Sequence, residues 1–484
     1  MTLKDRTILG AIWSFVDRIG NSFIQIILML ILARILDPKD FGTIGVLVVF
    51  SSISRILVEA GFSVALIRKQ NCEQILYSTV FYLNIIVSVV MYIALYILSP
   101  FIADFFNLQE LTLISKYYFI IIPIYSLSVI QYVILQKELN FKLYASISLI
   151  ALFISGIIAI ILAYLQFGVW SLIWQAIIQK VIVSFLLWYR CKWRPMLSFR
   201  FSSLKDIWNF SLNSFLTSML IAFFNNLYAI IIGKLYKVTE LGFYSQAKQI
   251  TTIPNITLIS VIQRAIFPSL SKIQSNTVVL KKTYIRVVRM LLFIIAPIFV
   301  GIFIVAEDLI VVVLGEKWLG ALKLVKILSL VAVFQPYINI SHSLLKITDQ
   351  TGKLLKIELI RRIIITITLI VTSFYSIEVI LYGHLIITIA FAMIFLLISG
   401  KKIELSIREL LYNSFGYVIV AIVSGFTSYI IISIFDISAV FRLVFYFLLT
   451  PIIYYLCLKK LRMGAYDEIL LIVNPFIKKI KKSE

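Results

Sequence analysis

Polar and charged side chains recur at helical spacing inside long apolar stretches of this 484-residue chain. In the first stretch, Ser14, Arg18, Asn21 and Gln25 are separated by four, three and four residues, and Asp17 lies beside them. This spacing places the side chains on one stripe of an α-helix. Because a bilayer offers polar groups no hydrogen-bonding partner, the stripe cannot face lipid. We expect it to line a polar cleft.

Similar stripes occur in three other apolar stretches. In the second stretch, Ser52, Arg55 and Glu59 follow the same spacing, and Arg55 and Glu59 at i and i+4 predict an ion pair. This pair either fixes the helix or contacts a substrate. The stripes of the seventh and eighth stretches comprise Ser211, Ser214, Ser218 and Asn225, and then Ser245, Gln249, Thr252, Ser260, Gln263 and Arg264.

Two arginines are poorly compensated within their own helices. Asp17 points about 100° away from Arg18 on a helix, and Arg264 has no acidic neighbour in the sequence. Because a guanidinium group binds phosphate through two hydrogen bonds, these arginines predict an anion site in the cleft. Lys180 is a weaker candidate. For every charged residue the alternative is a structural ion pair or a side chain that extends to the membrane interface.

The elements that position these residues are long apolar helices. The chain is 61% hydrophobic, its mean hydropathy is +1.02, and about fourteen stretches are long enough to cross a bilayer. We therefore expect an all-α, polytopic membrane protein. The predicted spans are Ile8–Leu36, Thr43–Ile67, Ile75–Leu98, Thr112–Leu135, Leu143–Leu165, Val169–Tyr189, Ile207–Ile232, Gln249–Leu270, Tyr284–Ala306, Ala321–Leu345, Ile357–Tyr375, Val379–Ser399, Tyr412–Phe435 and Val440–Leu458.

The net charge of +22 arises from 45 Lys and Arg residues that gather in alternate loops, including Lys346 to Arg362. This is the positive-inside pattern, which predicts cytoplasmic termini and argues against a nucleic-acid partner.

His342 and His384 have no acidic or cysteine partner nearby in sequence, so packing roles are favoured. Without metal-ligand spacing among the histidines and the three cysteines, we expect free thiols and neither a metal nor a cofactor.

An internal repeat organises the chain. The segment Arg34-Ile35-Leu36-x-x-x-Asp40-Phe41-Gly42 recurs 200 residues later as Lys234-Leu235-Tyr236-x-x-x-Glu240-Leu241-Gly242. A second similarity, between residues 100–111 and 307–318, follows the third span of each block. Blocks of six spans insert with the same orientation, which predicts parallel repeats. We expect six-helix lobes at 1–206 and 207–405, and two extra helices with a basic tail at 406–484.

Several longer segments resemble the polysaccharide transporters, which are the lipopolysaccharide and O-antigen flippases of the multidrug/oligosaccharidyl-lipid/polysaccharide exporter superfamily. The resemblance covers nearly the whole chain. Arg55-x-x-x-Glu59 followed by Gly61-Phe62-Ser63 also resembles the lipid II flippases, in which cavity arginines and a nearby acid serve transport. The segments are Leu32 to Gly42, Glu59 to Arg68, Leu241 to Gln249, Val261 to Lys272 and Gly315 to Trp318.

This resemblance implies a bacterial inner-membrane protein that moves undecaprenyl-diphosphate-linked oligosaccharides outward by alternating access, for lipopolysaccharide, O-antigen or capsular polysaccharide synthesis. It implies no enzymatic activity. The two last helices would form a groove for the lipid tail, and other polysaccharide-assembly membrane proteins are candidate partners. Coupling to H⁺ or Na⁺ would involve Asp17 or Glu59, the mid-span acids. The alternatives are a multidrug antiporter, a membrane polymerase or glycosyltransferase, and a scaffold without transport.

Overall fold

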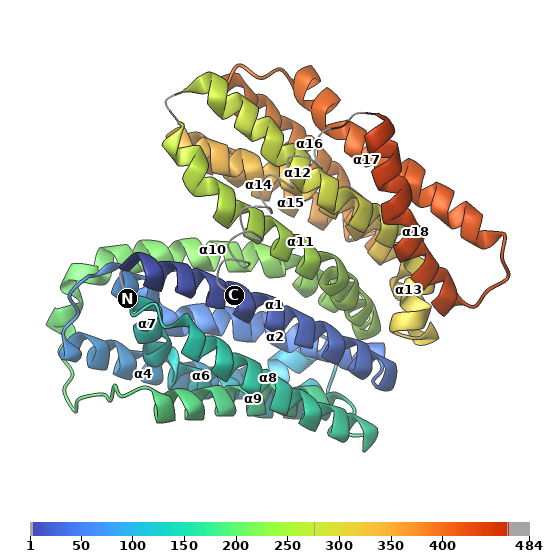
Figure 1. Cartoon of the computed structure of the whole chain (residues 1–484). Helices are drawn as coiled ribbons and strands as arrows, with labels where there is room; N and C mark the ends of the chain where they lie inside the picture. Colours follow the sequence, from blue (N-terminus) through green and yellow to red (C-terminus); the bar gives the residue numbers. More distant parts are fainter. Residues whose placement is uncertain (1–2, 275, 462, 464–484) are drawn as a thin grey trace, which may run out of the picture. The chain divides into compact units, whose positions relative to one another are not determined.

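The computed structural model describes residues 3–274, 276–461 and 463. Within these ranges the chain is helical and contains no strands (Figure 1). The helices are α1 (Leu3–Ile35), α2 (Pro38–Glu59), α3 (Phe62–Arg68), α4 (Gln74–Phe105), α5 (Leu111–Tyr118), α6 (Ile121–Ser126), α7 (Val129–Lys137), α8 (Phe141–Tyr164), α9 (Val169–Arg190), α10 (Lys205–Leu235), α11 (Val238–Lys272), α12 (Thr277–Ile304), α13 (Ala306–Val313), α14 (Leu322–Ile347), α15 (Thr351–Thr372), α16 (Ile377–Lys402), α17 (Ile407–Ser433) and α18 (Ala439–Lys460), with 3₁₀ turns η1 (Phe201–Leu204) and η2 (Glu316–Ala321).

Packing divides the chain into unit 1 (Met1–Ser245) and unit 2 (Gln246–Glu484). Their boundary lies within α11, whereas the repeat places a lobe boundary at residue 206. The two differ because α10 packs on α2 and α3 and so belongs to unit 1 by contact. Lobes are defined by repetition and not by packing, and the predicted lobes therefore stay a prediction.

Each predicted span overlaps a helix or a group of helices, which confirms a polytopic all-α protein. Among the described residues, hydropathy identifies 11 helices that are long and apolar enough to cross a membrane, or 12 when one bent pair counts as a span. Helices α11 and α15 are not among them. Charged and amide side chains interrupt the described part of α11, and α15 carries five charged side chains between Lys353 and Arg362. The number fourteen therefore stays a prediction.

Two predicted spans are not continuous helices. The span predicted at Thr43–Ile67 breaks between α2 and α3, where Ala60 and Gly61 have φ values of 44° and 74°. The span predicted at Thr112–Leu135 divides into α5, α6 and α7, and α6 meets α7 with a bend of 41°. Pro123 explains the break before α6, because its ring clashes with the carbonyl group four residues earlier.

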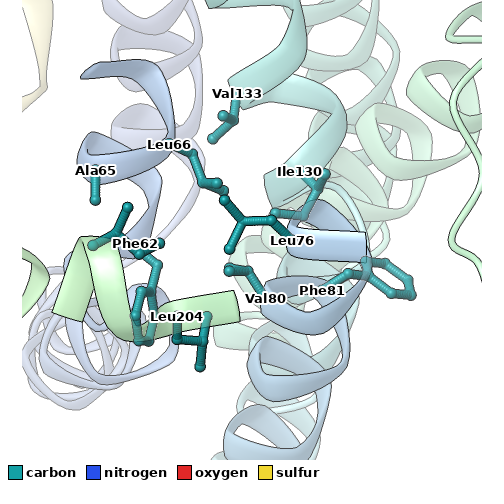
Figure 2. Packing of buried hydrophobic residues seen from close by; sticks show 10 residues of the cluster. Phe62, Ala65, Leu66, Leu76, Val80, Phe81, Ile130, Val133 and Leu204 are labelled. Carbon is teal, nitrogen blue, oxygen red and sulfur yellow. The ribbon is translucent and has the colours of Figure 1, made fainter. Parts of the chain in front are cut away.

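The short helix α3 is held by an apolar core (Figure 2). Its Phe62 and Leu66 pack against α4, α7 and η1, and Leu66 is fully buried. The other buried members of this core are Ala65, Leu76, Val80, Phe81, Ile130, Val133, Leu204 and Ile207. The break at Gly61 therefore redirects the chain so that α3 covers the ends of three other elements in unit 1.

In unit 2, α14 is buried along most of its length and packs between α12 and α16. The last two helices attach to this bundle, α17 on α12 and α18 on both α17 and α13. Arg442 Nη2 of α18 lies 2.8 Å from Asp308 Oδ1 of α13. The buried apolar contact beside this ion pair comprises Val305, Ile432, Leu443 and Tyr446.

The repeated motif folds in the same way at both of its positions. Helix α1 ends at Ile35 and α2 begins at Pro38, and 200 residues later α10 ends at Leu235 and α11 begins at Val238. The two turns also contact each other reciprocally in unit 1. A Cβ atom added to Gly42 would overlap the carbonyl oxygen of Val238, and one added to Gly242 would overlap that of Pro38. Both motif glycines are therefore required by close backbone approach.

We predict that Gly42→Ala destabilises the protein by about 1–3 kcal/mol, the usual cost of overpacking a tight contact. Gly242→Ala should behave similarly, and the double variant should cost less than the sum because both changes disturb one contact. Thermal unfolding in detergent measures the effect. The control is Gly352→Ala, since a Cβ there meets nothing within 4 Å. Equal stability of the Gly42 and Gly352 variants would contradict the proposed packing role.

Candidate functional site

The polar stripe of α1 connects this helix to α8. Asn21 Nδ2 donates to Asp17 Oδ1 at 2.7 Å, and Ser148 Oγ of α8 donates to Asn21 Oδ1 at 3.2 Å. Arg18 is half-buried and Gln25 is exposed. Asn21 therefore connects α1 to α8, whereas Arg18 and Gln25 keep side-chain surface that is accessible to other contacts.

The predicted ion pair between Arg55 and Glu59 is confirmed. Arg55 Nε lies 3.3 Å from Glu59 Oε1, and the hydroxyl of Tyr125 on α6 donates to the same carboxylate oxygen. The Arg55 side chain is 63% exposed, whereas that of Glu59 is 24% exposed. The carboxylate is thus held between two partners, while most of the Arg55 side chain remains exposed.

A second cation lies on the same tyrosine. The guanidinium carbon of Arg55 is 5.6 Å from the ring centroid of Tyr125, and Lys180 Nζ of α9 is 5.7 Å from it. An aromatic ring attracts cations through the negative charge of its face. Tyr125 therefore gathers two positive charges beside one carboxylate, Glu59, and the group carries a net positive charge.

Two further tyrosines extend the site towards α1. The rings of Tyr132 on α7 and Tyr144 on α8 lie 4.4 Å apart, and the side-chain amide of Gln136 donates to the Tyr132 hydroxyl. Both hydroxyls lie within electrostatic range of Arg55 and Asp17. We call Arg55, Glu59, Tyr125, Tyr132, Tyr144 and Lys180 the unit 1 site.

Sequence reasoning did not find the tyrosines of this site. The chain contains 25 Tyr residues, and tyrosines in membrane proteins commonly pack between helices or lie at the membrane interfaces, so composition alone does not single out any of them. Tyr125 and Tyr132 are seven residues apart, which on a continuous helix is two turns and would place both rings on one face. The chain breaks between α6 and α7, however, so this spacing alone does not determine where the two rings lie.

The predicted stripe of α10 is only partly buried. Ser218 is half-buried and Asn225 is exposed. The contact with α2 is instead made by the next residue, Asn226, whose Nδ2 donates to Ser52 Oγ at 3.0 Å. The sequence analysis named Asn225 and not Asn226, because helical spacing locates a polar stripe only to within about one residue.

In unit 2, the stripe of α11 contains Gln249, which is half-buried. Gln263 and Arg264 also fall within α11, but their side chains lie outside the described part of the structure. Unit 2 has a second charged group that the sequence did not predict. It joins His342 on α14 with Glu358, Arg361 and Arg362 on α15.

This group corrects one sequence expectation. Lys346 to Arg362 were counted with the basic loops, and the next span was predicted to begin at Ile357, but α14 continues to Ile347 and α15 already begins at Thr351. Arg361 and Arg362 therefore lie on a helix and are partly buried. His342, which was expected to lack an acidic partner, has Glu358 beside it. The pairing could not be found locally, because 16 residues separate the two.

Solved structures define the class of fold. A lipid II flippase MurJ, in an inward closed conformation, matches with a TM-score of 0.69 at 16% sequence identity over 94% of this chain and 99% of that one. A multidrug resistance MATE family transporter in an inward-facing conformation matches with a TM-score of 0.59 at 16% identity over 82% of this chain and 94% of that one. The chain therefore has the fold shared by these transporters.

Sequence comparison identifies the family. Residues 31–323 match the family described as polysaccharide biosynthesis protein. This chain is 26% identical over 341 residues to the teichuronic acid biosynthesis protein TuaB of Bacillus subtilis (strain 168), covering 69% of this chain and 70% of TuaB. It is also 26% identical over 357 residues to the lipopolysaccharide biosynthesis protein WzxC of Escherichia coli (strain K12), covering 71% and 70%. The chain belongs to this family of polysaccharide biosynthesis proteins.

We predict that Glu59→Ala lowers the amount of folded protein more than Arg55→Ala does. Loss of Glu59 removes both the ion pair and the acceptor of the Tyr125 hydroxyl, at a cost of about 1–3 kcal/mol. Loss of Arg55 should cost about 1 kcal/mol or less, because its side chain is mostly exposed. Thermal unfolding and membrane abundance measure both effects.

Glu59→Gln is the matched control, since it removes the charge but keeps an acceptor for Tyr125. It should be milder than Glu59→Ala. If both alanine variants kept normal abundance yet abolished transport, the ion pair would not be structural, and direct contact with substrate would be the better explanation.

Proposed function

We propose that this protein is a flippase that moves undecaprenyl-diphosphate-linked oligosaccharide repeat units across the bacterial inner membrane by alternating access. Family membership supports a role in polysaccharide biosynthesis. One relative, 24% identical over 336 residues covering 68% of each chain, is named the succinoglycan biosynthesis transport protein ExoT of Rhizobium meliloti (strain 1021). The observation that carries the proposal is the pair of cations, Arg55 and Lys180, on the ring of Tyr125.

The unit 1 site suits a diphosphate group. The exposed guanidinium of Arg55 offers paired donors to phosphate oxygens, and Lys180 adds a point charge on the same ring. Glu59 keeps Arg55 oriented without neutralising both cations. An anion that enters this site therefore interacts with both cations. Its negative charge offsets the free-energy cost of keeping Arg55 and Lys180 away from bulk water.

Sugar rings suit the neighbouring aromatic and amide groups. Tyr132 and Tyr144 present ring surfaces, while Asn21 and Gln136 present hydrogen-bonding groups nearby. Aromatic rings combine a large apolar surface with a polar tip, so they can contact both the faces and the hydroxyl groups of a sugar. The prenyl tail would remain in lipid, and α17 and α18 are the candidate groove for it.

The contact between the α1–α2 turn and the α10–α11 turn is a candidate for one end of the transport path, which must open and close. With both termini cytoplasmic, as the positive-inside pattern predicts, the α1–α2 and α10–α11 turns lie on the outer side. The contact of Gly42 with Val238 and of Gly242 with Pro38 would then close the outer end. Alternating access requires that this contact separate when the substrate leaves.

A multidrug antiporter is the alternative that the fold favours. Such a transporter takes up organic cations and therefore requires uncompensated carboxylates in its cavity. In unit 1 the two mid-span acids already have partners, Asp17 in Asn21 and Glu59 in Arg55 and Tyr125. The positive balance of the unit 1 site favours an anionic substrate instead.

The test of the proposed function is the lipid profile of a strain that lacks this protein. We expect the strain to accumulate diphosphate-linked oligosaccharide on the inner leaflet, because synthesis continues while export stops. The wild-type chain should restore export, and Arg55→Gln with Lys180→Gln should not. Extraction and leaflet-specific labelling of the lipid measure this. A strain with normal lipid distribution but increased drug sensitivity would favour the antiporter.

A second prediction concerns Arg18 and Arg264 as further anchors for the diphosphate. Because arginine binds phosphate bidentately, Arg→Gln at either position should lose most export at normal abundance, while Arg→Lys retains part of it. The double Gln variant should be less than additive if both residues hold one diphosphate. Export that stays near wild type in the double Gln variant would remove both residues from the site.

A further inference from the structure

The charged group of unit 2 joins two helices through a single carboxylate. Glu358 Oε1 of α15 lies 3.0 Å from His342 Nε2 of α14. Arg361, one turn along α15, donates from Nη2 to Glu358 Oε2 at 3.0 Å and from Nε to both carboxylate oxygens at 3.2 Å. Arg362 Nε is 3.7 Å from Glu358 Oε2. We call these four residues the α14–α15 charge cluster.

The cluster is sheltered, whereas the other cations at the start of α15 are not. Its side chains are between 16% and 22% exposed, while Lys353 and Lys356 are exposed. Moreover, α15 buries only one of its 22 residues, Leu369 in its last turn, and it packs mainly on α16. The charge cluster therefore provides a sheltered polar contact between the first half of α15 and α14.

The cluster combines residue types that differ in their protonation chemistry. Arginine remains protonated in proteins, and the carboxylate of Glu358 accepts hydrogen bonds from the guanidinium of Arg361. Histidine is the side chain whose charge ordinarily changes between pH 5 and 8. The ring of His342 is fixed by an edge contact with Phe395 of α16, with centroids 4.5 Å apart. This contact holds Nε2 towards Glu358.

Other titratable groups lie around the cluster. On α14 itself, Lys346 follows His342 by about one turn. His384 of α16 lies within electrostatic range of Arg361 and of Lys248 on α11. From α12, the hydroxyl of Tyr284 is 3.0 Å from the hydroxyl of Ser341, the residue before His342. Glu358 is the acid that the structure places 3.0 Å from Nε2 of His342, so it is the counter-ion that an imidazolium at position 342 would meet.

We propose that His342 binds the proton that couples transport to the proton gradient, and that its charge sets how firmly the first half of α15 docks on α14. This inference rests on the proposed function. A protonated ring forms an ion pair with Glu358 across the two helices, whereas a neutral ring can offer Glu358 only an uncharged N–H donor, which is a weaker connection. The proton enters from water on one side and leaves to water on the other, so no further reactant is needed.

The unit 1 acids are less suited to this role. Glu59 already has two partners, Arg55 on its own helix and Tyr125 on α6. Asp17 is bound by Asn21 on its own helix and by Ser148 of α8, and both of these partners are uncharged. In contrast, protonation of His342 alters an ion contact that joins α14 to the first half of α15.

Hydrogen exchange of the full chain in proteoliposomes tests the docking step without any substrate. Wild-type amides at positions 351–362 should exchange more slowly at pH 6 than at pH 8, by on the order of fivefold, after correction for intrinsic exchange. His342→Gln should lose this pH dependence. His342→Lys, with a fixed charge, should give slow exchange at both pH values. The matched control is His384→Gln, which should keep the wild-type response.

Transport tests the coupling step, with undecaprenyl diphosphate linked to one N-acetylglucosamine as the probe. An imposed pH gradient should accelerate movement of the probe by wild type and by His384→Gln, but not by His342→Gln. If His342→Gln kept either pH response, the proposal would be wrong while the flippase function stood. If wild type never moved the probe, the proposed function would fail, and the exchange experiment would still decide whether His342 controls α15.

Discussion

A charge inside a bilayer must find its counter-charge within the protein, because hydrocarbon cannot solvate it. Both polar centres of this molecule follow from that constraint. Glu59 in unit 1 and Glu358 in unit 2 are each bound by an arginine of the same helix and by a second group from a neighbouring helix. In each case the local partner supplies a counter-charge to the carboxylate, and the distant partner connects two helices. The difference lies in that distant partner, a tyrosine in unit 1 and a histidine in unit 2.

The difference matters for what each centre can do. Tyr125 brings two cations together on its ring beside one carboxylate, an arrangement suited to an anion. Under our proposal, a proton on His342 would change the charge of the α14–α15 cluster. A flippase requires both properties, because it must bind a diphosphate and must also change conformation in response to an energy source.

Close backbone approach provides the complementary mechanical feature. Polar networks tolerate small shifts, whereas the contact between the two repeated turns leaves no room for a Cβ atom at Gly42 or Gly242. The contact is either made or broken, since neither carbonyl group can yield without moving its helix. This two-state character suits a transporter, and the same fold occurs in the lipid II flippase and the multidrug transporter that resemble this chain.

The sequence alone was sufficient where the interactions are local or periodic. Apolar length predicted the helices, i to i+4 spacing predicted the Arg55–Glu59 pair, and the repeated motif predicted two equivalent turns, because each of these depends on neighbours within a few residues. The tertiary structure alone decided the rest. Tyr125 meets Glu59 across 66 positions of the chain, and His342 meets Glu358 across 16. No periodicity encodes such contacts, because they depend on how the helices bend and pack. For the same reason, the sequence could mark Gly42 and Gly242 as equivalent but could not show that each lies against the other's turn.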